Sequence, residues 1–226
     1  MPGRKLPLIT DEIYHVMNKG IDDHLTFSNK RELDRAVSTL DFYRFSSPPI
    51  KFSRFVSLKE EEKSKIYSSM VKTNKHLVEI LCFCLMPTHF HLLLKQVCDG
   101  GISKFLSNFQ NSHTRYFNTS HERKGSLFYD QFNAVRIVSN AQLLHVQRYI
   151  HINPLTSFIV KDFDSLLKYP WSSLPIYQNP QNSSMCSTEL ILSQFKNTND
   201  FLRFLSDHAD YQRTLHLIKL REARFP

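Results

Sequence analysis

The chain has 226 residues, of which 41% are hydrophobic and 12% aromatic, and this is enough apolar material for the core of one domain. Such a composition excludes the disordered, collagen-like and coiled-coil classes of protein. The 29 lysines and arginines outnumber the 21 aspartates and glutamates, and the formal net charge of +8 favours a polyanionic partner, with a solvated basic surface as the alternative.

Hydrophobic periodicity predicts one strand and two helices in the first third of the chain. Residues 12–19 alternate their side chains between two faces, as a strand does. Residues 29–45 repeat apolar side chains at the spacing of one helical face, with Ser28 or Asn29 as the N-cap. A second helix is expected to begin at Ser57, where the sequence has a capping-box pattern.

The middle of the chain predicts further strands around a long helix. Two apolar runs flank Pro87 within residues 76–96 and indicate two adjacent strands. Residues 102–117 have the apolar spacing of a long amphipathic helix. Residues 125–138 are aromatic and β-branched at their ends, which favours another strand or a hairpin.

The last third of the chain predicts helices separated by a polar linker. The next helix is expected to end by Asn153, because Pro154 restricts the residue before it. Residues 178–187 are rich in Ser, Asn and Gln and indicate a linker, and two short helical patterns follow at residues 190–195 and 201–220. Strands and helices therefore mix without regular alternation, which favours an α+β fold with helices on one face of a sheet.

Several function classes are excluded by what the motifs lack. The five glycines form neither a dinucleotide fingerprint nor a Walker loop, so we expect no nucleotide cofactor. The longest apolar run, residues 80–86, is far shorter than the roughly 20 residues that span a bilayer, and residues 1–10 lack an apolar signal region. The four cysteines contain no C-x-x-C pair. We therefore expect a cytoplasmic protein with no membrane partner.

Two short patterns carry residues suited to chemistry. His89 and His91 share one face of a predicted strand, and two neutral imidazoles side by side could bind one cation; a half-exposed strand that happens to carry two histidines is the alternative. Tyr149 and Asn153 lie one turn apart on a predicted helix, where a tyrosine could also be an amphipathic packing residue. Because a phenol is a weak nucleophile, attack on a phosphodiester needs either activation of the tyrosine or a strongly polarised phosphate. Mg²⁺ or Mn²⁺ held by the two histidines and Asn153 would supply the second.

Basic and aromatic residues are interleaved between the long helix and Tyr149. Cations for the backbone and rings for the bases are typical of single-strand binding, although the same pattern fits a solvated helix face beside a core. The cations predicted to contact DNA are Arg115, Lys124, Arg136 and Arg148.

Residues 84–94 (CLMPTHFHLLL) followed by residues 149–154 (YIHINP) resemble the HUH single-tyrosine transposases, which have an IS200-like transposase domain, and in particular the REP-associated tyrosine transposases. The resemblance runs in order from about residue 12 to residue 177. Supporting matches are YHVMNKG at residues 14–20, RYFN at residues 115–118 and GSLF at residues 125–128. Residues 129–132 depart from the family, because they read YDQF where relatives usually have QGRF.

This resemblance implies a ferredoxin-like or RRM-like antiparallel sheet covered by helices, with the two histidines on a central strand. It implies that His89, His91 and Asn153 bind Mg²⁺ or Mn²⁺, and that Tyr149 attacks single-stranded or hairpin DNA. A 5′-phosphotyrosine and a free 3′-hydroxyl would result, and the reverse step on another strand would rejoin the DNA. Tyr116 is the second candidate for the nucleophile.

The same resemblance places a transposase-like domain at residues 1–178 and a linker with a helical C-terminal tail at residues 179–226. The tail could form a homodimer, bind DNA or pack on the domain, and the protein would associate with the nucleoid when bound to DNA. Two other functions stay open. One is a non-cleaving protein that binds DNA or RNA hairpins and uses its sheet as a stacking platform, and the other is a metal-dependent hydrolase that uses water.

Overall fold

The structure is a computed structural model that describes residues 7–207. Its helices and strands follow one another in the order β1 (Ile13–Lys19), α1 (Lys30–Tyr43), α2 (Phe52–Phe55), α3 (Glu60–Thr73), β2 (Val78–Leu85), β3 (His89–Gln96), α4 (Gly101–Ser120), β4 (Asn133–Arg136), α5 (Asn140–Thr156), α6 (Phe163–Leu167), α7 (Leu174–Gln178), α8 (Glu189–Leu192) and α9 (Thr198–Ser206). Short 3₁₀ turns occupy Ile21–Asp23 and Pro180–Asn182. Within the described chain, no helix has both the length and the hydrophobicity to cross a bilayer.

The four strands form one antiparallel sheet in the order β2-β3-β1-β4. Helices α1 to α3 connect β1 to β2, and α4 connects β3 to β4. This is the strand order of a ferredoxin-like fold, and it confirms the α+β class with an antiparallel sheet. His89 and His91 lie on β3, an interior strand, so that part of the prediction is also confirmed.

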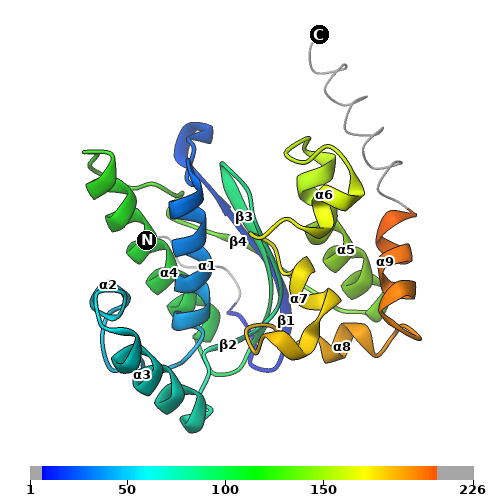
Figure 1. Ribbon diagram of the computed structural model, residues 1–226, viewed down its shortest axis with the longest axis horizontal. Coiled ribbons are helices and arrows are strands. Elements are labelled where there is room, and N and C mark those ends of the chain that lie inside the picture. Colours follow the sequence, from blue (N-terminus) through cyan, green and yellow to red (C-terminus); the bar gives the residue numbers. More distant parts are fainter. Residues whose placement is uncertain (1–6, 208–226) are drawn as a thin grey trace, which may run out of the picture.

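Helices cover both faces of this sheet. Figure 1 shows α1 and α4 on one side of the strands and α5 with the following helices on the other. Phe90, Leu92 and Leu94 of β3 point into the core beneath α1 and α4, whereas Leu93 belongs to a second core beneath α5. The expectation of helices on one face is therefore wrong. The reason is that β2 is apolar at nearly every position, as in strands that are buried from both sides.

Covering both faces also removes the open stacking platform that a sheet-based binding protein would need. The helix α5 contacts β2 and β3 directly, and α4 contacts the same two strands on the other face. Bases therefore cannot stack on an open face of the sheet.

The helix α5 begins as predicted and ends later. The side chain of Ser139 accepts a hydrogen bond from the Gln142 N–H and caps the helix. The helix then continues through Pro154 to Thr156, so the expected end at Asn153 is wrong. Pro154 lies in the last turn, where it removes one intrahelical bond, and burial of Leu155 in the second core favours the added turn.

Two other boundaries differ from the prediction. The second predicted helix, α3, begins at Glu60 with Lys59 as N-cap, because the Ser57 hydroxyl donates to the Arg54 carbonyl at the end of α2. Residues 125–138 contain only the short strand β4 and an isolated bridge that joins Gly20 to Phe128.

The described part of the C-terminal segment packs on the domain. Cys186 forms a parallel bridge with Ile80 of β2, and Ile191 of α8 lies in the core beneath α5. Phe201 and Leu205 of α9 are buried in the same core. The predicted helix at residues 201–220 corresponds to α9, and its part from residue 208 onward lies outside the described residues.

Candidate active site

Three histidines cluster on the face of the sheet that α5 covers. The rings of His89 and His91, two residues apart on β3, have centroids 5.0 Å apart. His15 reaches the same place from β1, where its Nε2 lies 3.0 Å from Nδ1 of His91. The cluster exists because β1 and β3 pair antiparallel and present alternate residues to one face.

The surroundings of these histidines keep them neutral. Burial lowers the pKa of His91 well below its usual value, and the neighbouring His89 and His15 lower it further. Burial is also the main cause that lowers the pKa of His89 and of His15. Neutral imidazoles are the form that can act as metal ligands or accept protons at pH 7.

Hydrogen bonds occupy the Nδ1 atoms of His89 and His91 and leave their Nε2 atoms available. Nδ1 of His91 is occupied by His15, and Nδ1 of His89 lies 3.0 Å from the Thr88 hydroxyl. Among residues 7–207, no hydrogen bond occupies the Nε2 of either ring, so each Nε2 is left for another partner. Because orienting hydrogen bonds on the far nitrogen are a regular feature of metal-binding histidines, this arrangement fits two metal ligands.

Tyr149 lies against this cluster from α5. Its ring centroid is 5.3 Å from that of His91 and 6.1 Å from that of His15, both in edge-on contacts. The residue is 42% exposed, so a strand of DNA could reach it. Burial of its inner side raises the pKa of Tyr149, and a hydrogen bond with Asn153 opposes the shift. The phenol therefore keeps its proton at neutral pH.

Asn153 follows Tyr149 by one helical turn and is only 4% exposed. Its Oδ1 accepts a hydrogen bond from the Ser157 hydroxyl at 3.0 Å. A carbonyl oxygen has a second lone pair, so Oδ1 could still accept from Tyr149 or ligate a cation. The structure thus brings His89, His91 and Tyr149 together, with Asn153 on the same helix as the tyrosine.

A buried polar network joins α5 to the sheet behind Tyr149. His151 Nε2 lies 2.8 Å from the Ser173 hydroxyl, and its Nδ1 lies 2.9 Å from Gln147 Oε1. The Ser173 hydroxyl in turn accepts from the backbone N–H of Phe83 on β2 at 2.9 Å. These bonds fix the rotation of α5, and hence the side on which Tyr149 projects.

Residues 51–153 match the model of the IS200-like transposase family. The resemblance to the IS200-like transposases is therefore confirmed. The matched range contains both histidines, Tyr149 and Asn153, and the match supports a transposase-type function.

Two solved structures resemble the chain, and no curated protein matches it. A REP-associated tyrosine transposase bound to a REP hairpin aligns with a TM-score of 0.46 and 14% identity, covering 77% of this chain and 84% of that one. A protein described as a transposase of Deinococcus radiodurans R1 aligns with a TM-score of 0.34 and 16% identity, covering 66% of this chain and 95% of that one.

The sequence predicts four cations to contact DNA, and the structure does not bring them together at Tyr149. The Arg148 guanidinium lies over the Phe204 ring of α9, 4.4 Å from its centroid. Arg136 of β4 forms an ion pair with Glu12. Lys124 is exposed in the loop after α4, and Arg115 is exposed on α4 itself, which covers the opposite face of the sheet.

Tyr116, the second candidate for the transposase nucleophile, is likewise on α4. Its ring lies 4.4 Å from the Arg35 guanidinium of α1. The helices α1 and α4 pack against each other on the face of the sheet opposite the histidines. The fold therefore separates Tyr116 from the histidine cluster.

Sequence reasoning did not identify His15 as a site residue. The alternation of side chains within residues 12–19 predicted only that His15 shares a face with Ile13 and Met17. The register of β1 on β3, which pairs Met17 with His91, is what brings His15 to the site. From the sequence, His15 could be recognised only as a histidine on a predicted strand. That information does not determine how this strand pairs with the strand that carries His89 and His91.

The histidine cluster offers few protein donors for a divalent ion. Within residues 7–207, no group of three or more His, Cys, Asp or Glu side chains is arranged to hold a metal. Two imidazoles and the Asn153 oxygen are the donors that remain. The nearby Cys84 is buried, and this burial raises the pKa of its thiol, so it stays protonated and is no competing ligand.

Proposed function

We propose that the protein is a transposase that cuts and rejoins single-stranded DNA with Tyr149 as the nucleophile. The observation that carries the proposal is the contact of the Tyr149 ring with His91, the most deeply buried member of the histidine pair. The match of residues 51–153 to the IS200-like transposases supports the reaction class.

In the proposed reaction, the Tyr149 oxygen forms a bond to a DNA phosphorus, and the bond from that phosphorus to the 3′ oxygen breaks. The phenol loses its proton and the leaving 3′ oxygen gains one, so protons balance. Tyr149 then holds the 5′-phosphate as a phosphotyrosine ester. Attack by a 3′-hydroxyl of another strand reverses the step, and the energy of the ester is conserved without a nucleotide cofactor.

The residues of the site have distinct parts in this reaction. His89 and His91 would hold Mg²⁺ or Mn²⁺ through Nε2, together with Oδ1 of Asn153. When bound, such an ion would polarise the phosphate oxygen and stabilise the charge that develops there. The edge-on contacts of Tyr149 with His91 and His15 keep its ring beside the histidine cluster. Thr88 and His15 orient the two imidazoles.

The test is incubation of the protein with single-stranded DNA from the flanks of its own gene and Mn²⁺, followed by a denaturing gel. Wild-type protein should give a covalent adduct, and Tyr149→Phe should give none while DNA binding stays nearly intact. Tyr116→Phe is the matched control and should still form the adduct. An undiminished adduct in Tyr149→Phe would remove this residue from the reaction.

The same experiment separates the two other functions. A binding protein that does not cleave would retain the DNA and give no adduct with any divalent metal. A hydrolase that uses metal and water would cut the DNA in Tyr149→Phe about as well as in the wild type.

A further inference from the structure

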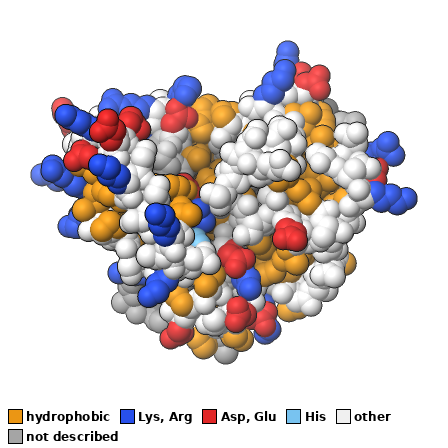
Figure 2. Space-filling model, turned by 60° about the horizontal axis from the view of Figure 1, so that its bottom comes forward, with side chains coloured by type: hydrophobic (Ala, Val, Ile, Leu, Met, Phe, Trp, Pro, Cys, Tyr) orange, Lys and Arg blue, Asp and Glu red, His pale blue; other side chains and the backbone are white. Residues whose placement is uncertain are grey.

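Charge alone does not single out the path of a DNA strand on this protein. On the face shown in Figure 2, basic and acidic side chains are interspersed. A residue that contacts the reacting strand must therefore be identified by its place relative to the histidine cluster and by what surrounds its side chain. Two exposed residues outside the proposed catalytic set meet both conditions, namely Lys19 at the end of β1 and Tyr129 in the loop before β4.

Lys19 lies on the active-site face of the sheet. Side chains alternate along β1, so Lys19 shares the face of His15. The register of β1 on β3 pairs Lys19 with His89, and residues paired in this way have Cβ atoms about 4.5–5.5 Å apart. Tyr149 instead contacts His91 and His15. Lys19 and Tyr149 therefore lie at opposite ends of the histidine pair.

Tyr129 lies beside Lys19. The preceding residue, Phe128, is buried in the core beneath α1 and α4, where its ring centroid is 5.7 Å from that of Phe90. Tyr129 points away from this core: it is 41% exposed, and its ring centroid is 5.7 Å from Nζ of Lys19. The ring therefore extends the active-site face beyond the end of β1.

Two hydrogen bonds to the end of β1 fix the backbone at Tyr129. Its N–H donates to the Lys19 carbonyl at 3.2 Å, and its own carbonyl accepts from Asn18 Nδ2 at 2.8 Å. Asn18 is buried, and its Oδ1 accepts from the Lys19 N–H at 2.9 Å. One buried amide thus holds both residues together. A ring whose backbone is already fixed loses little freedom when a ligand binds to it.

The side chains of Lys19 and Tyr129 are available to a ligand. Within residues 7–207, no hydrogen bond occupies the Tyr129 hydroxyl. The Lys19 ammonium forms an ion pair with Asp23 at 3.0 Å, but the two side chains are 46% and 76% exposed. Ion pairs this exposed contribute little stability, so a phosphate could replace Asp23 at Nζ.

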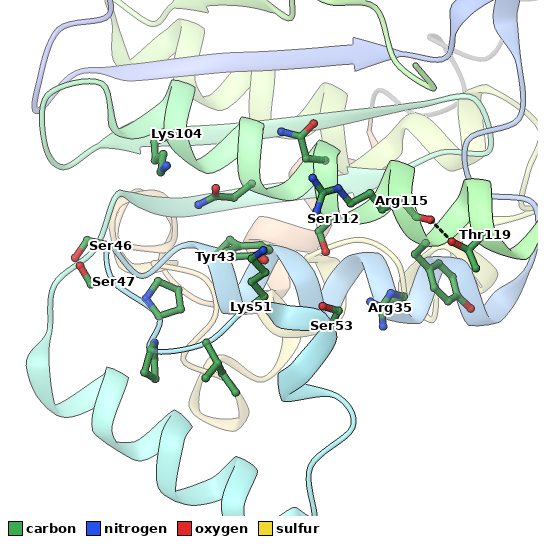
Figure 3. Close-up of a pocket in the computed structure, with 16 residues that line it drawn as sticks. Arg35, Tyr43, Ser46, Ser47, Lys51, Ser53, Lys104, Ser112, Arg115 and Thr119 are labelled. Carbon is green, nitrogen blue, oxygen red and sulfur yellow. Dashed lines mark hydrogen bonds between the residues drawn. The ribbon is translucent and has the colours of Figure 1, made fainter. Parts of the chain in front are cut away.

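The tyrosines of another basic surface are less available. Figure 3 shows a cleft between α1, α4 and residues 46–53, on the other face of the sheet. There the Arg35 guanidinium lies over the Tyr116 ring, 4.4 Å from its centroid. The Tyr43 hydroxyl accepts a backbone hydrogen bond at 3.2 Å, and both tyrosines are half-buried. Tyr129 therefore differs from these tyrosines in exposure as well as in its place near the histidines.

We propose that Lys19 and Tyr129 form a subsite for the unpaired nucleotide next to the phosphate that is cut, and we call this pair the strand subsite. The Tyr129 ring stacks on the base, and the Lys19 ammonium contacts the phosphate that flanks the reacting one, because rings and cations together are typical of single-strand binding. The proposal rests on the proposed function, which supplies DNA as the ligand and places the reacting phosphate at Tyr149. Because every base has an aromatic face, the strand subsite distinguishes unpaired from paired DNA without selecting a sequence.

The test of the ring compares Tyr129→Leu with Tyr129→Phe. Fluorescence anisotropy with a labelled single strand from the flanks of the gene, without divalent metal, gives the affinity in the absence of chemistry, and thermal melting shows that each variant is folded. Loss of one stacked base should weaken binding by Tyr129→Leu about 5- to 150-fold. Tyr129→Phe retains the ring and should stay within a few-fold of the wild type. Equal losses in the two variants, or equal losses for the single strand and its duplex, would overturn the stacking.

Strands with one abasic position show whether the ring and a base are in contact. In the wild type, one abasic position near the cut should weaken binding about as much as Tyr129→Leu does. In Tyr129→Leu, the same abasic position should cost nothing further, because groups in contact give losses that do not add. Additive losses at every position would overturn the contact between Tyr129 and a base.

The test of the cation compares Lys19→Gln with Lys65→Gln, which removes an exposed lysine of α3. Loss of one phosphate contact on a single strand should lower the slope of log K against log salt by about 0.7 and weaken binding at 0.1 M salt about fivefold. Lys65→Gln should change both quantities far less. Equal changes in the two variants would remove Lys19 from the strand subsite, because net charge alone would then explain them.

Adduct formation keeps this proposal separate from the proposed function. With Mn²⁺, Tyr129→Leu should raise the strand concentration that gives half-maximal adduct formation more than it lowers the rate at saturation. If the variants lose affinity as expected and the wild type forms no adduct, the proposed chemistry fails and the strand subsite stands. If the wild type forms the adduct and Tyr129→Leu binds single strands like the wild type, the strand subsite fails alone.

Discussion

Replacement of His15 tests how the candidate active site prepares its metal ligands. His15 Nε2 lies 3.0 Å from His91 Nδ1, and burial lowers the pKa of both rings, so two neutral imidazoles share one proton in this contact. If a divalent ion binds Nε2 of His91, the proton of that ring must be on Nδ1 and His15 must accept it. We therefore expect His15 to hold His91 in the tautomer that can bind a metal.

The structure sets the size of the effect. His91 is 2% exposed, so bulk water cannot replace a lost acceptor, and a buried N–H without a partner costs about 1–3 kcal/mol. Loss of an orienting partner lowers metal affinity by about 10- to 100-fold in other metal sites. The two figures agree, because a tenfold change corresponds to about 1.4 kcal/mol. His15→Leu should therefore weaken Mn²⁺ binding by about 10- to 100-fold.

The assay is calorimetric titration of Mn²⁺ into the full chain without DNA, at neutral pH. His15→Gln should stay within a few-fold of the wild type, because an amide oxygen can accept the same proton. His145→Leu removes an exposed histidine of α5 and should leave the affinity unchanged. Thermal melting shows whether each variant is folded. Wild-type affinity in a folded His15→Leu, or equal losses in the Leu and Gln variants, would refute the tautomer argument.

Two further predictions concern the scaffold. Burial tends to raise the pKa of Glu32, but hydrogen bonds from His121 and Ser28 outweigh this effect, and the pKa is lowered. The ionised Glu32 therefore stabilises the fold fully above the ordinary carboxylate pKa. This stabilisation is lost as the pH falls through the lowered value. Glu32→Gln should lower the free energy of unfolding by about 1–3 kcal/mol at pH 7, and urea titrations should show this deficit shrinking on acidification. His151→Phe breaks the contacts with Ser173 and Gln147, so we expect a lower melting temperature and a reduced yield of the Tyr149 adduct; a stable variant with full adduct yield would contradict the positioning role.

The parts of the site that follow from local geometry could be predicted from the sequence. Alternation along a strand is enough to place His89 and His91 on one face, and the helical repeat is enough to place Asn153 one turn after Tyr149. The order of strands and helices along the chain predicted the α+β class. These relations depend only on positions near one another in the chain.

Relations between distant segments could not be predicted in this way. His15 reaches His91 through strand pairing, and Phe204 covers Arg148 from a helix far along the chain. Pro154 remains helical because the turn that contains it packs on the sheet. In each case a tertiary contact outweighs or adds to the local conformational preference. Such a contact cannot be predicted from a single sequence unless the pairing of the distant segments is known.

The distribution of cations bears on how recognition and chemistry could be divided. A cation beside a reacting phosphate would stabilise it, but Arg136 is paired with Glu12 and Arg148 lies over Phe204. The charge that stabilises a phosphate at Tyr149 would therefore have to come from a bound metal. Salt strongly weakens contacts between phosphates and lysine or arginine side chains, because each such contact releases counterions. If the proposed function holds, raising the salt concentration should lower the affinity for DNA while adduct formation on saturating short strands persists.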